Sequence, residues 1–243
     1  MIAATLACAL IFVAIHLFIG RMSGLHAARR SGWLSFCGGV AVAYVFLHVL
    51  PELAVHNAVL ARWIGEDAWL ADQVVYLVAL SGLLVFYGLE RHVQASRQTN
   101  RAETGEDRPE ETVFHIHMAA FAAYNLIIGY LLLHREEPGF RSLALYAAAL
   151  GVHFLSNDFG LFLHHREEYA RRVRWIMAGA VLAGWALGLA IEVHEAALAL
   201  IFAFLAGSVV MNVMKEELPE DRAARFAPFF GGTAFYGAVL LIA

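Results

Sequence analysis

A short stretch of this sequence places ionisable and amide side chains inside an apolar run long enough to cross a bilayer. His153, Asn157 and Asp158 lie within it, and His153 and Asn157 form an i, i+4 pair that shares one helix face. Ionisable side chains at membrane depth are costly and are usually functional. Imidazole nitrogen, amide oxygen and carboxylate together suit a divalent cation such as zinc, iron(II) or manganese(II).

The preceding apolar run supplies a second set of polar side chains. It contains His117, Tyr124 and Asn125, and a rise of about 1.5 Å per residue brings Asn125 to the depth of His153. His117 then lies at about the depth of Asn157 and Asp158. We therefore expect the two helices to enclose one ring of polar side chains. The alternative is that these side chains form a hydrogen-bonded cluster that only joins the helices.

Histidines and glutamates also gather where apolar runs end. This outer group comprises His48, Glu52, His56, Glu192, His194 and Glu195. Two of its pairs have i, i+4 spacing and would collect a cation at the mouth of a site, although solvated loop residues give the same pattern. We expect the remaining histidines to have structural or interfacial roles. They include His16, His115, His164 and His165.

The composition assigns the chain to the membrane proteins. Hydrophobic residues make up 60% of its 243 residues, charged residues only 16%, and the mean hydropathy is +0.64. Apolar runs that approach the length of about 20 residues needed to cross a bilayer recur along the chain. They cover about residues 2–20, 32–50, 69–89, 112–133, 141–163, 173–191, 195–214 and 226–243. We therefore predict an all-α membrane protein, a single domain of eight transmembrane helices over residues 1–243.

The basic residues favour one orientation in the membrane. The connections after the first, third, fifth and seventh runs contain 14 of the 17 Lys and Arg residues. Cytoplasmic loops collect Lys and Arg, so these connections are predicted inside and both termini outside. The polar segment at about 90–111 carries both signs of charge and is predicted to be a mobile cytoplasmic loop. Runs six and seven are predicted to form a tight hairpin.

One phrase occurs twice in the chain. Gly39 precedes Pro51-Glu52 by twelve residues, and Gly207 precedes Pro219-Glu220 by the same spacing. Each phrase is typical of an apolar helix that begins at small residues and ends at Leu-Pro-Glu. The predicted topology puts the two phrases in opposite orientations, which indicates an inverted-repeat transporter. Chance is the alternative, since Leu-Pro-Glu often ends a helix.

These segments resemble the ZIP family of divalent-metal transporters. GGVAVAYVFLHVLPEL is similar to the second span of that family, AGSVVMNVMKEELPE to its seventh and MAGAVLAGWALGLAI to its sixth. The resemblance covers nearly the whole chain and implies a 3+2+3 arrangement, in which spans 1–3 and 6–8 form an inverted repeat. It also implies a metal site carried by spans 4 and 5.

The sequence departs from the family pattern at the metal site. His153 and Asp158 match the first histidine and the last acid of the fifth-span motif, whereas Asn157 replaces its second histidine. The corresponding fourth-span positions hold Ala120, Phe121, Tyr124 and Asn125. The resemblance therefore implies one mononuclear site on the three fifth-span residues instead of a binuclear site.

We therefore expect ZIP-like transport of a divalent metal cation (zinc, iron(II) or manganese) toward the cytoplasm of a bacterial cell, across its inner membrane. The metal is the transported substrate, the other partner is the lipid bilayer, and no organic cofactor or nucleic acid is implied. A homodimer is left open. One alternative is a ZIP-like interaction or regulatory protein without transport. Another is an intramembrane hydrolase whose His/Asp metal site activates water, although we do not expect an enzyme.

Overall fold

The structure is all-helical, as predicted. The computed structural model describes residues 1–20, 30–65, 68–106, 108–135, 139–164, 166–216 and 225–242. The α-helices within these ranges are α1 (Ile2–Phe18), α2 (Arg30–Tyr44), α3 (Leu50–Ile64), α4 (Val74–Thr104), α5 (Glu111–Leu131), α6 (Phe140–His164), α7 (Arg166–Glu168), α8 (Arg174–Ala190), α9 (Glu195–Glu216) and α10 (Phe226–Ile242). Two π-helical turns interrupt them, η2 (Val45–Val49) and η3 (Tyr169–Val173).

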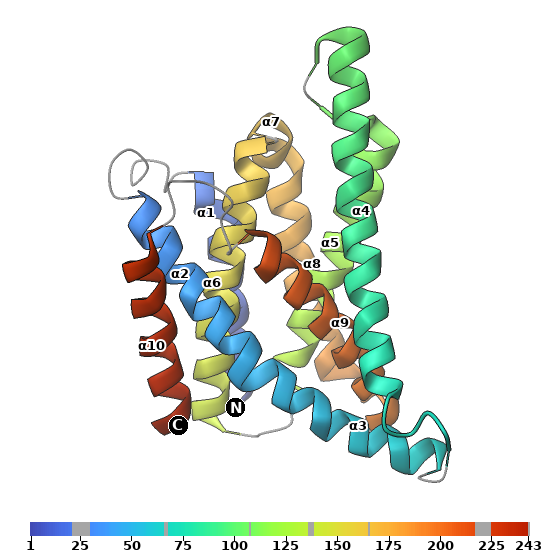
Figure 1. Ribbon diagram of the computed structural model, residues 1–243. Coiled ribbons are helices and arrows are strands. Elements are labelled where there is room, and N and C mark those ends of the chain that lie inside the picture. Colours follow the sequence, from blue (N-terminus) through green and yellow to red (C-terminus); the bar gives the residue numbers. More distant parts are fainter. Residues whose placement is uncertain are drawn as a thin grey trace.

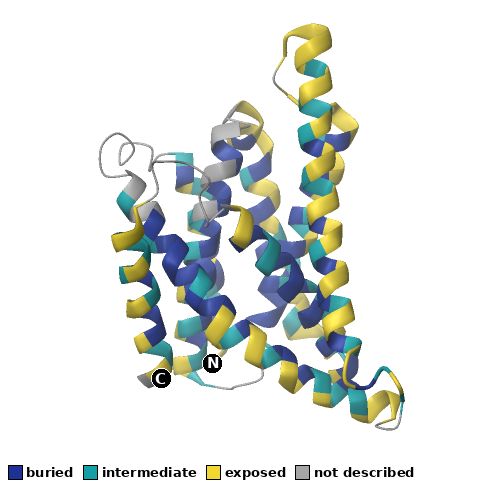
Figure 2. Ribbon diagram, viewed as in Figure 1, coloured by how far each residue is buried: buried dark blue, intermediate teal, exposed yellow. Residues whose placement is uncertain are grey.

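The described helices have the lengths and composition of a membrane protein. Five helical segments of the described part are long and apolar enough to cross a bilayer: Ser35–Ile64, Val74–Thr104, Glu111–Leu131, Tyr169–Ala190 and Glu195–Lys215. Shorter apolar helices, Ile2–Phe18, Phe140–Leu155 and Phe226–Leu241, lie where the first, fifth and eighth spans were predicted. The outward faces of the bundle expose large apolar side chains, such as Leu80 and Leu84 on α4 (Figure 2).

The ends of the bundle agree with an even number of crossings. The start of α1 and the end of α10 lie at the same end of the molecule, together with α3 (Figure 1). The tip of the α4–α5 hairpin lies at the opposite end. The hairpin between α8 and α9 is as short as predicted, since only residues 191–194 separate the two helices.

The second predicted span does not end at Leu50-Pro51-Glu52. Instead the chain stays helical to Ile64, with Pro51 in the first turn of α3 and Gly65 after it at a φ of 100°. Proline lacks the N–H that would bond four residues back, at Leu47, and that residue lies inside η2. The wider π turn thus absorbs the proline without ending the helix. The matching Pro219-Glu220 lies outside the described residues.

The predicted cytoplasmic loop at about 90–111 is largely helical, which corrects the sequence reading. α4 continues to Thr104, and Gly105 ends it at a left-handed φ of 78°. The segment is polar but rich in good helix formers, and Gln94 donates to Glu90 across one turn at 3.0 Å. Figure 1 shows the resulting helix extending beyond the rest of the bundle.

Two helix crossings repeat each other with a constant offset along the chain. A Cβ on Gly39 of α2 would lie 2.0 Å from Phe229 O of α10, and one on Gly207 of α9 would lie 1.7 Å from Ala79 O of α4. The reciprocal glycines, Gly232 and Gly82, meet the carbonyl oxygens of Phe36 and Phe204. Gly207 and Phe204 of α9 lie 168 residues after Gly39 and Phe36 of α2. Ala79 and Gly82 of α4 lie 150 residues before Phe229 and Gly232 of α10. The repeated phrase thus marks two equivalent contacts between backbones.

The pair formed by α5 and α8 crosses in the same way. Gly129 of α5 faces Val181 O, and Gly184 of α8 faces Leu126 O. α5 reaches α6 differently, through long side chains such as Tyr146, whose hydroxyl donates to Ile128 O at 3.2 Å. The α5–α6 gap therefore contains side chains, and Tyr124 and His153 of the predicted site meet in it.

Candidate functional site

Buried polar side chains line the facing sides of α1, α5 and α6. Each of the following is less than a tenth exposed: His16, His117, Tyr124, Asn125, His153, Asn157 and Asp158. All six predicted site residues are therefore buried, and the interior position predicted for His153, Asn157 and Asp158 is confirmed. His16 is an addition that the sequence analysis placed among the structural histidines.

His153 and Tyr124 meet where the sequence predicted contact between the fourth and fifth spans. Tyr124 Oη lies 3.0 Å from His153 Nε2, and the hydrogen bond between them is buried. Phe154, the next residue of α6, packs on His16 with 4.7 Å between ring centroids. The imidazole of His153 is thus held at the α5 side of α6 by a phenol and not by a carboxylate.

Asp158 has a partner that the sequence analysis missed. His16 Nδ1 of α1 donates to Asp158 Oδ2 at 2.6 Å, and both residues have 0% exposure. Asp158 follows His153 by five residues, a turn of about 140° around the helix, so it faces α1 while His153 faces α5. Tyr169 Oη also donates to the backbone oxygen of His16 at 3.1 Å, which fixes the end of α1. The predicted ring is therefore divided between two faces of α6.

A signal for this pair was present in the sequence. His16 lies a few residues before the inner end of the first run, and Asp158 lies at a similar distance from the inner end of the fifth. Both runs point the same way in the predicted topology, so the two residues have about the same depth. Matching buried ionisable residues by depth across all spans would have paired them, since a buried carboxylate needs a partner.

The amide and the remaining imidazole of the predicted set have other neighbours. Asn125 donates to Phe121 O at 2.8 Å and contacts Met177 Sδ of α8 at 3.3 Å. His117 Nε2 lies 3.8 Å from Glu90 Oε2 of α4. Neither residue contacts His153, so the predicted ring between spans 4 and 5 contains fewer side chains than the depth estimate indicated.

Several buried polar atoms in this region make no hydrogen bond in this structure. They are His16 Nε2, Asp158 Oδ1 and Asn125 Oδ1. A buried polar atom without a partner is rare and costly, so its presence needs a reason such as a water or an ion. Among the described residues no group of three or more His, Cys, Asp or Glu side chains is arranged to hold a metal ion. A cation here would need amide, phenol or water oxygens as well.

Two members of the outer group, His48 and Glu52, line a pocket of about 200 Å³. Its polar lining includes His48, Glu52, His134, Arg135 and Ser142. His48 Nε2 lies 3.2 Å from Glu52 Oε2, so that i, i+4 pair is formed. Burial lowers the pKa of the Arg135 guanidinium below its ordinary value, while Tyr146 and Cys8 act in the opposite direction. The pocket therefore holds charges of both signs.

Two other predicted mouth residues have structural roles. His56 is buried with its ring 4.3 Å from that of Phe202, centroid to centroid. His194 Nδ1 accepts a hydrogen bond from the backbone N–H of Ala196 at 3.2 Å, in the first turn of α9. His56 is therefore a packed helix residue and His194 a residue at the start of α9, and neither lines the outer pocket.

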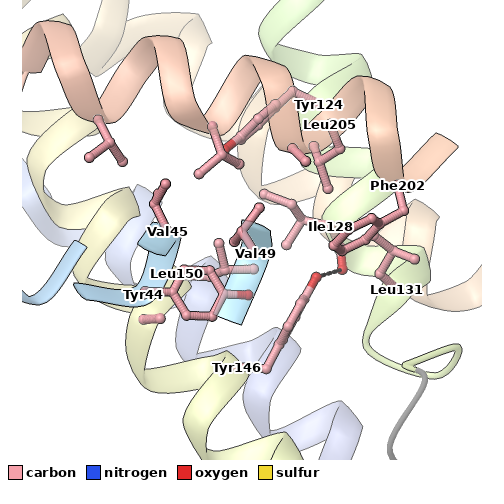
Figure 3. Close-up of a cluster of buried hydrophobic side chains, with 14 of the residues drawn as sticks. Tyr44, Val45, Val49, Tyr124, Ile128, Leu131, Tyr146, Leu150, Phe202 and Leu205 are labelled. Carbon is pink, nitrogen blue, oxygen red and sulfur yellow. Dashed lines mark hydrogen bonds between the residues drawn. The ribbon is translucent and has the colours of Figure 1, made fainter. Parts of the chain in front are cut away.

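A layer of packed, mostly apolar side chains lies between the outer pocket and His153. Leu131, Tyr146 and Phe202 line the pocket and also belong to the core cluster drawn in Figure 3. The same cluster contains Ile128 and Tyr124, which Figure 3 labels. The hydroxyl of Tyr124 in turn lies within hydrogen-bond distance of His153. The route from the outer pocket to the buried histidine is therefore closed by side chains in this structure.

No protein-family model matches the chain, and no curated protein matches its sequence. Fold and composition define an all-helical membrane protein.

Proposed function

We propose that this protein transports a divalent metal cation (zinc, iron(II) or manganese) across the membrane toward the cytoplasm, in the manner of the ZIP family. The observation that carries the proposal is the buried polar set on α1, α5 and α6 with unpaired acceptors on His16, Asn125 and Asp158. Polar groups at this depth are retained when they serve a substrate pathway.

An arrangement of eight spans would support the proposal. Beside the five helices long enough to cross a bilayer, three shorter apolar helices lie along the first, fifth and eighth predicted spans. The matched glycine crossings fit an inverted repeat, since they relate α2 with α10 to α9 with α4. In transporters of this kind the substrate site lies between the repeats, and here α5 and α6 would carry it.

The cation would pass through three regions. It would first meet His48 and Glu52 in the outer pocket, then cross the layer around Tyr146 when the two repeats rock apart. At depth, Asp158 on the α1 side of α6 would supply the negative charge that a dehydrated cation needs. His153 lies on the α5 side in this structure, so it would have to leave Tyr124 and turn toward Asp158 to complete the coordination together with Asn157. His16 would keep Asp158 paired while the site holds no cation.

One set of observations favours a ZIP-like interaction or regulatory protein that does not transport. Asp158 is already paired with His16, and His153 with Tyr124, so both groups have partners without any cation. These bonds also join α1, α5 and α6, as structural polar clusters do.

Metal flux separates the two functions. The purified chain is reconstituted in liposomes that contain a zinc-sensitive or iron-sensitive dye, and a metal gradient is applied. Transport predicts dye signal above that of empty liposomes, saturating with metal concentration. Signal equal to that of empty liposomes for zinc, iron(II) and manganese would leave the interaction protein as the function.

A further inference from the structure

Three helices converge on one carboxylate at the end of the bundle predicted to face the cytoplasm. Glu90 Oε2 of α4 lies 2.8 Å from Lys215 Nζ of α9 and 3.8 Å from His117 Nε2 of α5. The other oxygen, Oε1, accepts from Gln94 at 3.0 Å. The Glu90 side chain is 17% exposed, while that of Lys215 is 33% exposed. This cluster, Glu90, Gln94, His117 and Lys215, is called the inner cluster below.

The inner cluster has the ligands of a cation site with an ammonium in it. Carboxylate and imidazole are the groups that borderline divalent cations such as manganese(II), iron(II) and zinc bind, and water fills the remaining positions. The Lys215 ammonium is a compact charge on a flexible stem at the last turn of α9. Its larger exposure means that it can leave Glu90 for solvent, whereas Glu90 and His117 are held by their helices.

We propose that the inner cluster is an exit site for the transported cation, and that Lys215 is its tethered counter-cation. The proposal rests on the proposed transport function. A divalent cation that reaches Glu90 and His117 displaces the ammonium of Lys215. The two charges of the cation and the one charge of the ammonium would repel each other if both stayed beside the single carboxylate. The ammonium returns to Glu90 when the cation leaves.

The exchange links occupancy to the shape of the exit. With the ammonium in place, Glu90 joins α4 to α9 and lies against α5. When Lys215 is displaced, the side-chain link between α4 and α9 at this end is lost, although the Gly82–Gly207 crossing remains. The end near Glu90 is then the part of these helices that opens.

Equilibrium binding of Mn²⁺ to the purified full chain in detergent, followed by the loss of the free Mn²⁺ EPR signal, tests the exit site. Lys215→Met removes the competing charge at nearly constant length. It is expected to bind Mn²⁺ about tenfold more tightly than the parent chain, or to bind one further equivalent. Adding Glu90→Gln to Lys215→Met should abolish the gain. Arg108→Met is the matched control, because it removes the basic partner of Glu106 in an exposed pair at 2.6 Å.

A second variant keeps the test decisive if Lys215→Met does not fold. Lys215→Arg retains the ion pair and grips the carboxylate with two donors, so it should weaken Mn²⁺ binding below that of the parent chain. Equal binding by parent, Lys215→Met and the double variant would overturn the exit site, as would equal binding by parent and Lys215→Arg. Binding is measured without flux, so a parent chain that fails to take up metal overturns the transport function instead.

Discussion

At the scale of single residues, the Asp158–His16 pair sets the strongest constraint in the described structure. A fully buried carboxylate is stable only while its partner stays, and the partner here comes from α1, far away in the sequence. The desolvation of both groups offsets most of their attraction, so the pair contributes little compared with apolar residues of the same size. Removing one member, however, leaves an uncompensated buried group.

A double-mutant cycle on this pair has a predicted sign. His16→Leu alone and Asp158→Leu alone should each destabilise the protein by about 3–5 kcal/mol, because each leaves the other group buried without its partner. The double variant His16→Leu/Asp158→Leu should recover most of that loss. Unfolding midpoints in detergent measure the three values. A double variant as unstable as the two single variants added together would show that the groups do not interact.

The outer pocket allows a milder prediction at this scale. His48→Ala should weaken metal uptake without abolishing it, since water replaces the imidazole in a solvent-connected pocket and Glu52 keeps its charge. The same outcome is expected for His194→Ala, whose ring caps α9. Initial uptake rates in liposomes at several metal concentrations test both. Complete loss of uptake in either variant would assign that histidine a central role.

Some residues of the candidate site could be predicted from their sequence, and others could not. Spacing and depth predicted that His153 faces the bundle interior at the level of Asn125, with Tyr124 or Asn125 within reach, and the structure has Tyr124 bonded to it. The partner of Asp158 was missed because helical spacing relates residues within one helix or one hairpin only. His16 belongs to the first helix, and its contact depends on how α1 packs against α6, which spacing does not determine.

At the scale of elements, glycine positions determine how the helices cross. At Gly39 and Gly207 the partner backbone occupies the place of a Cβ, so even alanine would collide with a carbonyl oxygen. At Gly231 of α10 and Gly179 of α8, an added Cβ would meet no atom within 4 Å. The small residues of the repeated phrase are therefore required by packing, whatever the protein transports.

This difference predicts the effect of alanine at each glycine. Gly39→Ala and Gly207→Ala should each cost about 1–3 kcal/mol, the usual range for overpacking, because the helices must move apart. Gly231→Ala and Gly179→Ala should be neutral or stabilising by up to about 1 kcal/mol, since alanine favours a helix more than glycine does. Thermal unfolding in detergent distinguishes the two classes. Equal midpoints for all four variants would contradict the close crossings.

The residues at which helices end could not be predicted from the sequence. Leu50-Pro51-Glu52 was interpreted as a helix end because proline lacks an N–H, but a π turn before it keeps the helix continuous to Ile64. The segment at about 90–111 was predicted to be a mobile loop because it is polar and carries both signs of charge. Charged side chains keep a segment out of lipid but do not prevent it from being helical. α4 therefore continues to Thr104 with polar side chains on its surface.

At the scale of the whole molecule, the charge pattern and the fold both place the α4–α5 connection at the end of the bundle opposite the amino terminus. The connections rich in Lys and Arg alternate with connections that are nearly free of them. The tip of the α4–α5 hairpin lies opposite the start of α1 in Figure 1. The two signals come from independent properties, composition and packing, and both require the α4–α5 connection to face the cytoplasm if the amino terminus is outside.

Cysteine labelling checks this orientation. With Cys8 and Cys37 replaced by alanine, Gln98→Cys should react with an impermeant maleimide only after the cells are opened. Asp72→Cys, in the turn before α4, should react in intact cells, and both side chains are exposed in the structure. Labelling of Gln98→Cys in intact cells would reverse the orientation and with it the predicted direction of transport.

The central claim, that the buried polar set carries a divalent cation, is tested most directly by metal uptake with and without the Asp158 carboxylate. Parent chain, Asp158→Ala and the surface variant Glu106→Ala are reconstituted at equal amounts, and zinc and iron(II) entry into liposomes is followed under an inward gradient. Folding of each is confirmed by its unfolding midpoint. The account predicts saturable entry for the parent and Glu106→Ala, and background entry for a folded Asp158→Ala. Equal transport by parent and Asp158→Ala would contradict the assigned site.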